Sequence, residues 1–175
     1  YTELTPCWNE LRAGFAYSAG IKQDNSLWTW GENASGQLGD GTYTNKNYPV
    51  MIGPPGAWLS VATGREHTLA IGTNGTLWAW GSNTFGQLGD GTTAPKNQPV
   101  QIGTATDWMA VAAGEDFSMA LKSDHSLWAW GNNQYGQLGT GNNNGVLQPV
   151  QSGTITNWSS ISCGQFHVLG TLDNG

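Results

Sequence analysis

All ten tryptophans of the chain fall on a lattice with a 50-residue step. The three columns of this lattice are Trp8, Trp58, Trp108 and Trp158; Trp28, Trp78 and Trp128; and Trp30, Trp80 and Trp130. A step of this length that carries several short strand-like runs is typical of a propeller blade or a solenoid unit, which cannot bury its apolar face without a neighbour. The chain is therefore a repeat protein, and its function is to be sought where the copies differ.

Each copy contains four short apolar or aromatic runs that predict β-strands. In the second copy these runs cover 58–63, 67–71, 77–81 and 99–102. Proline recurs in the fourth run, at Pro49, Pro99 and Pro149. Because proline cannot donate a hydrogen bond to a neighbouring strand, it belongs on an edge strand. The fourth strand is therefore expected at the outer rim of each unit.

A short turn joins the second and third runs of each copy. Its two central positions are Asp24-Asn25, Asn74-Gly75 and Asp124-His125. These residue types tolerate positive φ angles, so they predict a tight two-residue hairpin loop.

The repeat resembles that of the regulator of chromosome condensation family. The residues of the second copy that match the family pattern are Gly64, His67, Thr68, Trp78, Trp80, Gly81, Asn83, Gly86, Gln87, Leu88, Gly89, Pro99 and Val100. The resemblance implies an all-β fold, a β-propeller of four-stranded antiparallel blades that usually has seven blades. Three full units are expected at 8–57, 58–107 and 108–157, with a lead-in at 1–7 and the first half of a fourth unit at 158–175.

A chain of this length covers only part of such a ring. An open stack of blades would present unpaired strands at both ends, and such edges invite pairing with another chain. Further blades could come from the same longer chain or from other copies. We favour the longer chain, because a natural boundary rarely falls inside a two-residue turn.

Composition narrows the classes of partner. The formal net charge is −6, and the six Lys and Arg residues are scattered singly, so the chain lacks the basic patch that nucleic acid requires. No run approaches the length of a membrane span. Low charge together with many Asn and Thr predicts a bacterial exported or cell-surface protein.

Several residues that attract chemical interpretations are better explained by structure. His67 and His167 are in register with Tyr17 and Phe117, so the position accepts any aromatic ring. The repeated glutamines, Gln37, Gln87 and Gln137, lie between glycines and are expected to bond loop backbone. Asp40 and Asp90 resemble a calcium loop, but Thr140 replaces them in the third copy, so a loop-capping role is favoured. We expect no metal and no cofactor.

The tryptophans leave a choice between core packing and sugar recognition. Trp78 and Trp80 lie two apart on one strand and so share a sheet face. Burial of aromatic rings there would stabilise blade stacking. We therefore expect Trp28, Trp30, Trp78, Trp80, Trp128 and Trp130 to be largely buried, with a row of sugar platforms as the alternative. Cys7 and Cys163 are separated by about three blades, too far for a disulfide.

The loops after the first and third strands differ most between copies and should open on one face. Chemically varied side chains on a rigid scaffold are typical of a protein-recognition surface. The candidate binding residues are Phe15, Arg65, Glu66, Glu115, Asp116, Gln165, Phe166, Tyr43, Lys46 and Lys96. Among them Arg65-Glu66 and Glu115-Asp116 are the strongest, because they would form a mixed-charge and an acidic patch side by side that steers a basic partner.

The favoured function is a non-enzymatic propeller scaffold that binds an as yet unknown protein. The resembling family includes nucleotide-exchange factors for small GTPases and a secreted inhibitor of β-lactamases, which makes an exchange-factor-like module one alternative and a carbohydrate-binding propeller the other. An enzyme is not expected, because the sequence supplies no recurring nucleophile, metal cluster or paired carboxylates.

Overall fold

The computed structural model describes residues 7–173, and the regular elements in this range are β-strands. In the first unit they are β1 (Trp8–Ala13), β2 (Tyr17–Lys22), β3 (Leu27–Gly31) and β4 (Lys46–Ile52). In the second they are β5 (Trp58–Thr63), β6 (His67–Gly72), β7 (Leu77–Gly81) and β8 (Lys96–Gln101). In the third they are β9 (Trp108–Ala113), β10 (Phe117–Lys122), β11 (Leu127–Gly131) and β12 (Val146–Gln151), followed by β13 (Trp158–Cys163) and β14 (Val168–Leu172).

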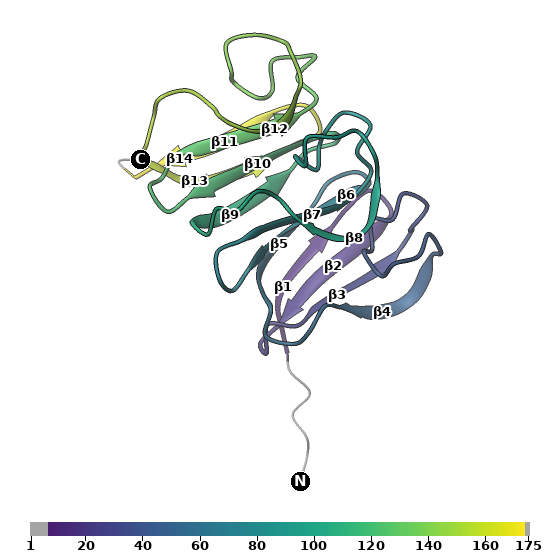
Figure 1. The fold of residues 1–175 in the computed structure, drawn as a ribbon. Coiled ribbons are helices and arrows are strands. Elements are labelled where there is room, and N and C mark those ends of the chain that lie inside the picture. The colour runs from purple at the N-terminus through teal and green to yellow at the C-terminus, as the bar shows by residue number, and fades with distance from the viewer. Residues whose placement is uncertain (1–6, 174–175) are drawn as a thin grey trace.

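Each unit forms one antiparallel sheet whose strands are paired in chain order. The sheets are β1-β2-β3-β4, β5-β6-β7-β8, β9-β10-β11-β12 and the two-stranded β13-β14. They lie next to one another in chain order, from purple to yellow in Figure 1. The first strands β1, β5, β9 and β13 contact one another in turn, so these strands are innermost. The expected architecture, a part of a β-propeller with four-stranded blades, is confirmed.

The apolar core lies between blades rather than within one. Ile21 and Leu27 of the first blade pack with Trp58, Val61 and Trp80 of the second. An equivalent cluster joins the second blade to the third. Since each cluster draws its residues from two sheets, a blade becomes stable only when a neighbour covers its face.

The second strands begin with an aromatic ring that lies close against the glycine that follows the first strand. A Cβ atom added to Gly64 would lie 2.2 Å from the His67 ring, and one added to Gly114 would lie 2.0 Å from Phe117. Both rings are buried. Glycine is required here because any side chain would collide with the ring. The ring itself can be that of tyrosine, histidine or phenylalanine.

The hairpin between the second and third strands differs from the expected two-residue loop. Lys22 N–H donates to the Ser26 carbonyl (3.0 Å) and Asn25 N–H donates to the Lys22 carbonyl (2.9 Å). Among the non-glycine residues described, only Asn25 and His125 have positive φ, at 58° and 62°. The loop therefore has three residues, a turn followed by one left-handed residue, which is the next most common hairpin connection.

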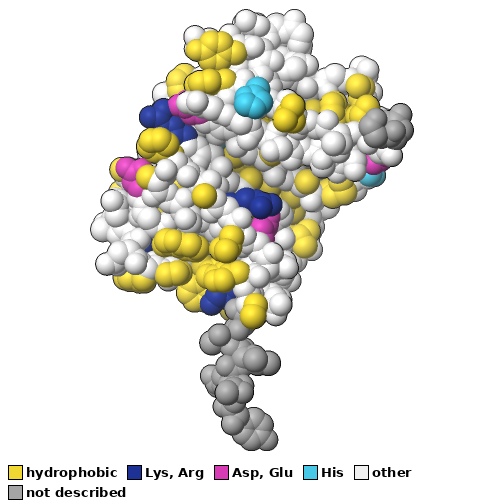
Figure 2. Space-filling view, turned by 180° about the vertical axis from the view of Figure 1, so that it is seen from behind, with side chains coloured by type: hydrophobic (Ala, Val, Ile, Leu, Met, Phe, Trp, Pro, Cys, Tyr) yellow, Lys and Arg dark blue, Asp and Glu magenta, His cyan; other side chains and the backbone are white. Residues whose placement is uncertain are grey.

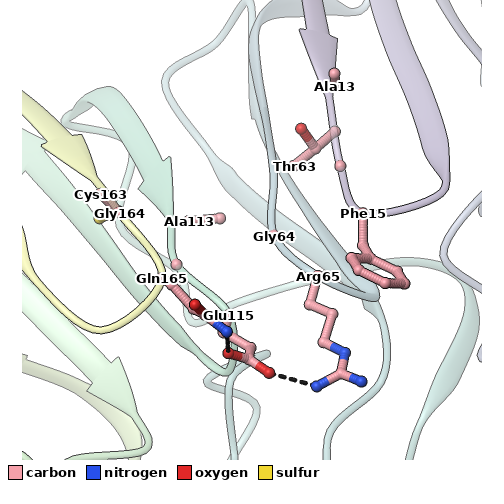
Figure 3. Close-up of a pocket in the computed structure, with 12 residues that line it drawn as sticks. Ala13, Phe15, Thr63, Gly64, Arg65, Ala113, Glu115, Cys163, Gly164 and Gln165 are labelled. Carbon is pink, nitrogen blue, oxygen red and sulfur yellow. Dashed lines mark hydrogen bonds and ion pairs between the residues drawn. The ribbon is translucent and has the colours of Figure 1, made fainter.

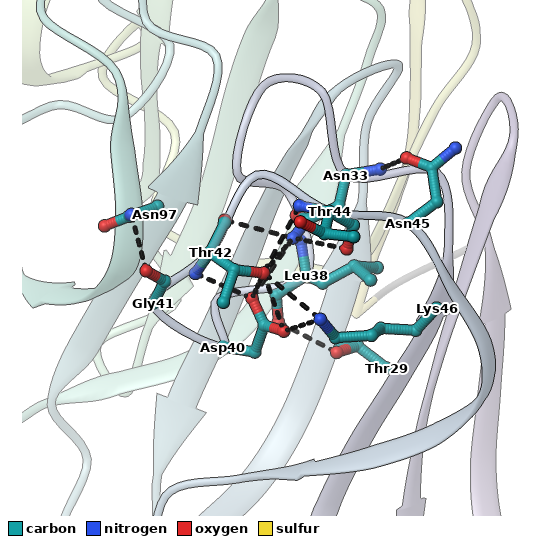
Figure 4. Close-up of polar contacts among 10 residues, drawn as sticks. All are labelled: Thr29, Asn33, Leu38, Asp40, Gly41, Thr42, Thr44, Asn45, Lys46 and Asn97. Carbon is teal, nitrogen blue, oxygen red and sulfur yellow. Dashed lines mark hydrogen bonds and ion pairs between the residues drawn. The ribbon is translucent and has the colours of Figure 1, made fainter.

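The loop between the third and fourth strands is built around a buried asparagine (Figure 4). Asn33 Nδ2 donates to Asp40 Oδ1 (3.1 Å) and the Thr42 carbonyl (3.0 Å), while its Oδ1 accepts from Leu38 N–H (2.9 Å). Asp40 Oδ1 also accepts from Thr42 N–H (2.9 Å). Asp40 therefore caps its own loop. Burial alone would raise the pKa of its carboxyl, but hydrogen bonds from Lys46 and Thr42 outweigh burial and lower that pKa.

The face drawn in Figure 2 combines apolar side chains with few charged ones. The dark blue and magenta groups on that face are scattered rather than gathered into a patch. In the described part of the chain, no helix has the length and apolar character needed to cross a membrane.

Candidate protein-binding face

The loops after the first and third strands of each blade meet at one end of the sheets, which we call the loop face. Ser35 Oγ, in the β3–β4 loop, donates to Glu66 Oε2 in the β5–β6 loop (2.9 Å). One blade further on, Gln87 Nε2 donates to Asp116 Oδ1 (3.3 Å). Neighbouring blades therefore hold each other's loops, and the face is a continuous surface on a rigid support.

A cavity of about 530 Å³ opens where the inner strands end on this face (Figure 3). Small residues at the ends of the inner strands line its interior: Ala13, Gly14, Thr63, Gly64, Ala113, Gly114, Cys163 and Gly164. Four larger side chains, which occupy the same position in successive units, line the rest: Phe15, Arg65, Glu115 and Gln165. Burial raises the pKa of the Cys163 thiol to about 12, so the sulfur stays protonated at neutral pH.

These four rim residues bind one another in a chain across the blades (Figure 3). Arg65 forms an ion pair with Glu115, whose second oxygen accepts from Gln165 Nε2. The Arg65 guanidinium lies 5.4 Å from the centre of the Phe15 ring. The ion pair with Glu115 raises the pKa of Arg65. The rim is therefore a connected polar and aromatic arc.

The mixed-charge pair Arg65-Glu66 and the acidic pair Glu115-Asp116, expected side by side, are joined by the Arg65–Glu115 ion pair. The Glu115 side chain is only 10% exposed because it is paired on both sides. Asp116 is half-buried, and burial followed by repulsion from Glu115 raises the pKa of its carboxyl. Glu66 lies 3.7 Å from Arg65. Arg65 and Glu115 occupy equivalent positions of adjacent blades and form an ion pair, so these two charges neutralise each other, while Glu66 and Asp116 leave an excess of acidic groups beside them.

The outer candidates divide into paired lysines and an exposed tyrosine. Lys46 Nζ lies 2.9 Å from Asp40, and Lys96 Nζ lies 3.3 Å from Asp90. Both lysines hold their own loops, whereas Tyr43 projects into solvent. Of these three, Tyr43 is the one whose side chain is available to another molecule.

Exposed aromatic rings mark the loop face. Phe15 is 74% exposed, Tyr135 is 62% exposed, and Phe85 and Phe166 are also exposed. The rings of Tyr135 and Phe166 meet edge to face at 5.2 Å. Sequence reasoning missed Phe85 and Tyr135. The sequence did contain a signal for them. Ser35, Phe85 and Tyr135 occupy equivalent positions of the three copies, so this position varies within a loop whose other residues mostly recur.

The residues assigned to structure have diverse environments. His67 is buried, its pKa is lowered to about 3 by burial, and its Nε2 lies 3.0 Å from Ser118 Oγ. His167 is exposed. The side-chain oxygens of Gln37, Gln87 and Gln137 each accept a backbone N–H two residues earlier in their own loop, at 2.9 Å. Within residues 7–173, no three His, Cys, Asp or Glu side chains gather as a metal site would require.

The tryptophans fall into two groups by burial. Trp80 and Trp130 are fully buried, and their indole N–H groups donate to the Gln37 and Gln87 carbonyls of the preceding blade (3.0 and 2.8 Å). The remaining four of the six expected core tryptophans are partly exposed: Trp28, Trp30, Trp78 and Trp128. None of the six is among the exposed large side chains, so their burial differs in degree, complete for Trp80 and Trp130 and partial for the other four. Cys7 and Cys163 are free thiols.

Stacked four-stranded blades with a variable loop face define a β-propeller of tandem repeats. The regulator of chromosome condensation (RCC1) repeat matches residues 24–71, 74–121 and 124–170, and a second form of this repeat matches 58–87 and 110–137. The chain belongs to the RCC1 repeat family.

Solved structures of similar fold include propellers from yeast and human. Prp20p from Saccharomyces cerevisiae is 20% identical with a TM-score of 0.80, over 93% of this chain and 43% of that one. Yeast Prp20 bound to Kap60 gives 21% identity and a TM-score of 0.80, over 95% and 43%. Human WBSCR16 gives 17% identity and a TM-score of 0.70, over 98% and 59%. The chain thus spans less than two thirds of each of these proteins.

Proposed function

We propose that the chain is a non-enzymatic propeller scaffold that binds another protein through its loop face. The observation that carries this proposal is the presence of four exposed aromatic rings on the loops of this face, where hydrogen bonds join the loops of neighbouring blades. The four rings are those of Phe15, Phe85, Tyr135 and Phe166. Aromatic residues and arginine dominate the binding energy of many protein interfaces. Rigid loops also reduce the entropy lost when a partner binds.

Similar propellers lend support to a protein partner. The yeast Prp20p structure was determined together with a study of its binding to Gsp1p and histones, and Prp20 has also been crystallised with Kap60. We transfer to this chain only the class of activity, binding of a protein, and not those partners.

The site chemistry is poorly suited to catalysis. The thiol that lines the rim cavity is Cys163, and its raised pKa keeps it in the unreactive form. The carboxylate at the rim is Glu115, which is fully engaged by Arg65 and Gln165. A binding role therefore fits this cavity better than a nucleophilic one.

A row of sugar platforms is also less well supported. The indole N–H groups of Trp28, Trp78 and Trp128 each donate to a hydroxyl of their own hairpin at 2.8 Å. Lysine ammonium groups lie over Trp28 and Trp128 (4.2 and 4.7 Å from the ring centres). Two of the three rings therefore have a face already covered.

The experiment is a pull-down with three baits. The first is the natural sequence, the second carries Phe85→Ser and Tyr135→Ser on the loop face, and the control carries Tyr48→Ser on the outer strand β4, where the side chain is also exposed. A protein retained by the first and control baits and lost with the second supports the proposal. Equal retention by all three baits, with melting temperatures unchanged, would exclude the loop face as the binding surface.

A further inference from the structure

The end of the second strand carries a lysine in two of the three complete blades. Lys22 Nζ lies 5.2 Å from the Trp8 ring centre and 4.2 Å from that of Trp28. In the third blade, Lys122 Nζ lies 4.8 and 4.7 Å from the corresponding indoles. An ammonium within about 6 Å of a ring face is attracted by its quadrupole. These blades therefore place their own cation between two tryptophans.

The second blade keeps the two indoles but has no lysine. Trp58 and Trp78 meet at 5.9 Å and 81°, the same distance and angle as Trp108 and Trp128 in the third blade. The residue in register with the lysines is Gly72. A cavity of about 740 Å³ lies at this place, lined by Gly72, Trp58, Trp78, Met51 and Asn74 among others.

Backbone geometry does not require glycine at this position. Gly72 is absent from the residues with positive φ. A Cβ atom there would lie 2.8 Å from Asn74 Oδ1 and from Thr76 Oγ1, both at the ends of side chains. The equivalent turn of the first blade has the same arrangement with Asp24 and Ser26 beside Lys22. Because Lys22 coexists with that arrangement, a small shift of the two side-chain ends would admit a lysine at position 72. Glycine there leaves the indole pair without a cation of its own; Trp78 is partly exposed beside it, and Trp58 is 5% exposed.

The surroundings select the kind of cation. In the third blade, Lys122 Nζ lies 3.2 Å from the Asp107 carboxylate. The corresponding residue of the second blade is Ala57, and the turn carries Asn74 where the other blades have aspartate. Among the residues that line the cavity, the carboxylate is that of Asp40, which is paired with Lys46. A primary ammonium needs acceptors for its three N–H donors, whereas an alkylated ammonium needs only the aromatic faces.

We propose that the cavity between the first and second blades binds a trimethylammonium group against Trp58 and Trp78. Aromatic surroundings are a recurrent means of recognising such groups, because quaternary ammonium carries charge without hydrogen-bond donors. Met51 and the two indoles supply the apolar contact for the methyl groups.

Nuclear magnetic resonance of the indole N–H groups tests the proposal within one molecule. Titration with choline chloride should shift the Trp58 and Trp78 signals saturably and leave those of Trp8, Trp28, Trp108 and Trp128 unchanged. The neutral carbon isostere, with a tert-butyl group in place of trimethylammonium, should bind with an affinity at least about tenfold lower. Equal shifts at all three indole pairs, or equal binding of the isostere, would overturn the proposal.

Two substitutions should exchange which indole pair binds the ligand, the pair of the second blade or that of the third. Gly72→Lys should abolish the choline response of Trp58 and Trp78, because the new ammonium takes the ligand's place. Lys122→Gly should create a response at Trp108 and Trp128, and since Asp107 remains there, ethanolamine should bind this second site as well. Failure of Lys122→Gly to gain any response, in a variant that retains the native spectrum elsewhere, would contradict the proposal even if Gly72→Lys does not fold.

The source of the trimethylammonium group is decided by a second titration. A short peptide with one trimethyllysine that binds more tightly than choline would assign the site to a modified partner protein. Weaker binding of the peptide would assign it to a small soluble cation. Binding of neither compound would overturn the proposal.

Discussion

At the residue scale, the aromatic position after each first strand shows how one geometry accepts several chemistries. Gly14, Gly64 and Gly114 leave room for a ring, and Tyr17, His67 and Phe117 occupy it. The polar atoms of these rings then find different partners. Tyr17 donates its hydroxyl proton to the His67 carbonyl, whereas His67 reaches the hydroxyl of Ser118. Packing against the glycine therefore fixes where the ring lies, whereas the hydrogen bonds that the ring makes to the next blade differ from copy to copy.

The burial of His67 predicts a loss of stability in mild acid. The pKa of its imidazole is about 3 in the folded chain and near 6.5 in the unfolded chain. Between these values the unfolded chain binds the proton, so the stability due to neutral His67 is complete above pH 6.5 and falls as the pH is lowered towards 3. At pH 5 the loss is about 2 kcal/mol.

The variant His67→Phe, which places the third blade's ring in the second, should remove this pH dependence. Ser118 Oγ keeps its own acceptor, the Gln87 carbonyl, at 2.7 Å. Urea unfolding followed by tryptophan fluorescence at pH 7.5 and pH 5 measures the difference. The acidic residues titrate in both proteins and cancel in the comparison. An equal loss of stability in the two proteins would show that His67 is not the group responsible.

Residue-level function was only partly predictable. Comparison of the copies identified Phe15, Arg65 and Glu115 as variable, which is a property of sequence. That Arg65 and Glu115 pair with each other depends on the convergence of adjacent blades at the inner strands, and a one-dimensional alignment of copies contains no such distance. The sequence therefore indicates which residues vary, and the structure shows which of them remain available.

At the scale of elements, the buried asparagine of each long loop replaces regular secondary structure. In the second blade, Asn83 donates to Asp90 Oδ1, the Thr92 carbonyl and the Ala94 carbonyl, and accepts from Leu88 N–H, at 3.0–3.1 Å. One side chain thus satisfies several groups of a chain segment that has no strand partner. The sequence showed only that this Asn recurs in each copy, and these contacts give the physical reason.

Asn83→Ala should therefore destabilise the chain by about 2–3 kcal/mol, because it leaves a buried N–H and carbonyl oxygens without partners. The matched control is Asn143→Ala, an exposed asparagine whose amide makes one bond to the Gln134 carbonyl at 3.2 Å. The control should lie within about 0.5 kcal/mol of the natural chain. Chemical denaturation of both variants checks the prediction, and similar losses for the two would mean that the loop is not held by its asparagine.

The hairpin loops show where element-level prediction was wrong. Residue types at Asp24-Asn25 allowed either one or two left-handed residues, and composition alone did not decide between a two-residue and a three-residue loop. In the structure, the Asp24 carboxylate accepts from Ser26 N–H (3.1 Å) and from the Ser26 hydroxyl (2.6 Å). These bonds favour a turn at aspartate followed by a single left-handed residue, and they lower the pKa of Asp24.

At the scale of the whole molecule, stability comes from contacts between blades. The Gln37 carbonyl accepts both Thr68 Oγ1 (2.8 Å) and Trp80 Nε1 (3.0 Å) of the next blade. The Trp lattice made this repeat architecture and its register predictable, because columns of large side chains at one step require neighbours to cover them. Burial was less predictable, since Trp78 and Trp80 share a face but lie at different depths.

This difference in depth predicts unequal effects of truncation. Trp80→Ala should destabilise the chain by about 3–5 kcal/mol, because it leaves a cavity between two blades. Trp78→Ala should cost less, since its ring is partly exposed and borders an existing cavity. Thermal and urea unfolding rank the two variants. A larger loss for Trp78→Ala would indicate that the inter-blade core is centred elsewhere.

The two end sheets predict self-association of the 175-residue chain. Leu11 is 54% exposed on the first sheet and Leu169 is 68% exposed on the last, whereas Val61 and Leu69, in the same positions of the second blade, are fully buried. Exposed apolar positions of this kind favour contact with another blade.

Size-exclusion chromatography with light scattering should give a mass above 18.6 kDa that rises with concentration. Leu11→Asp with Leu169→Asp should lower that mass, whereas Leu59→Asp, at an exposed leucine of β5 in the second blade, should not. A stable monomer of 18.6 kDa at every concentration would show that these faces do not drive association.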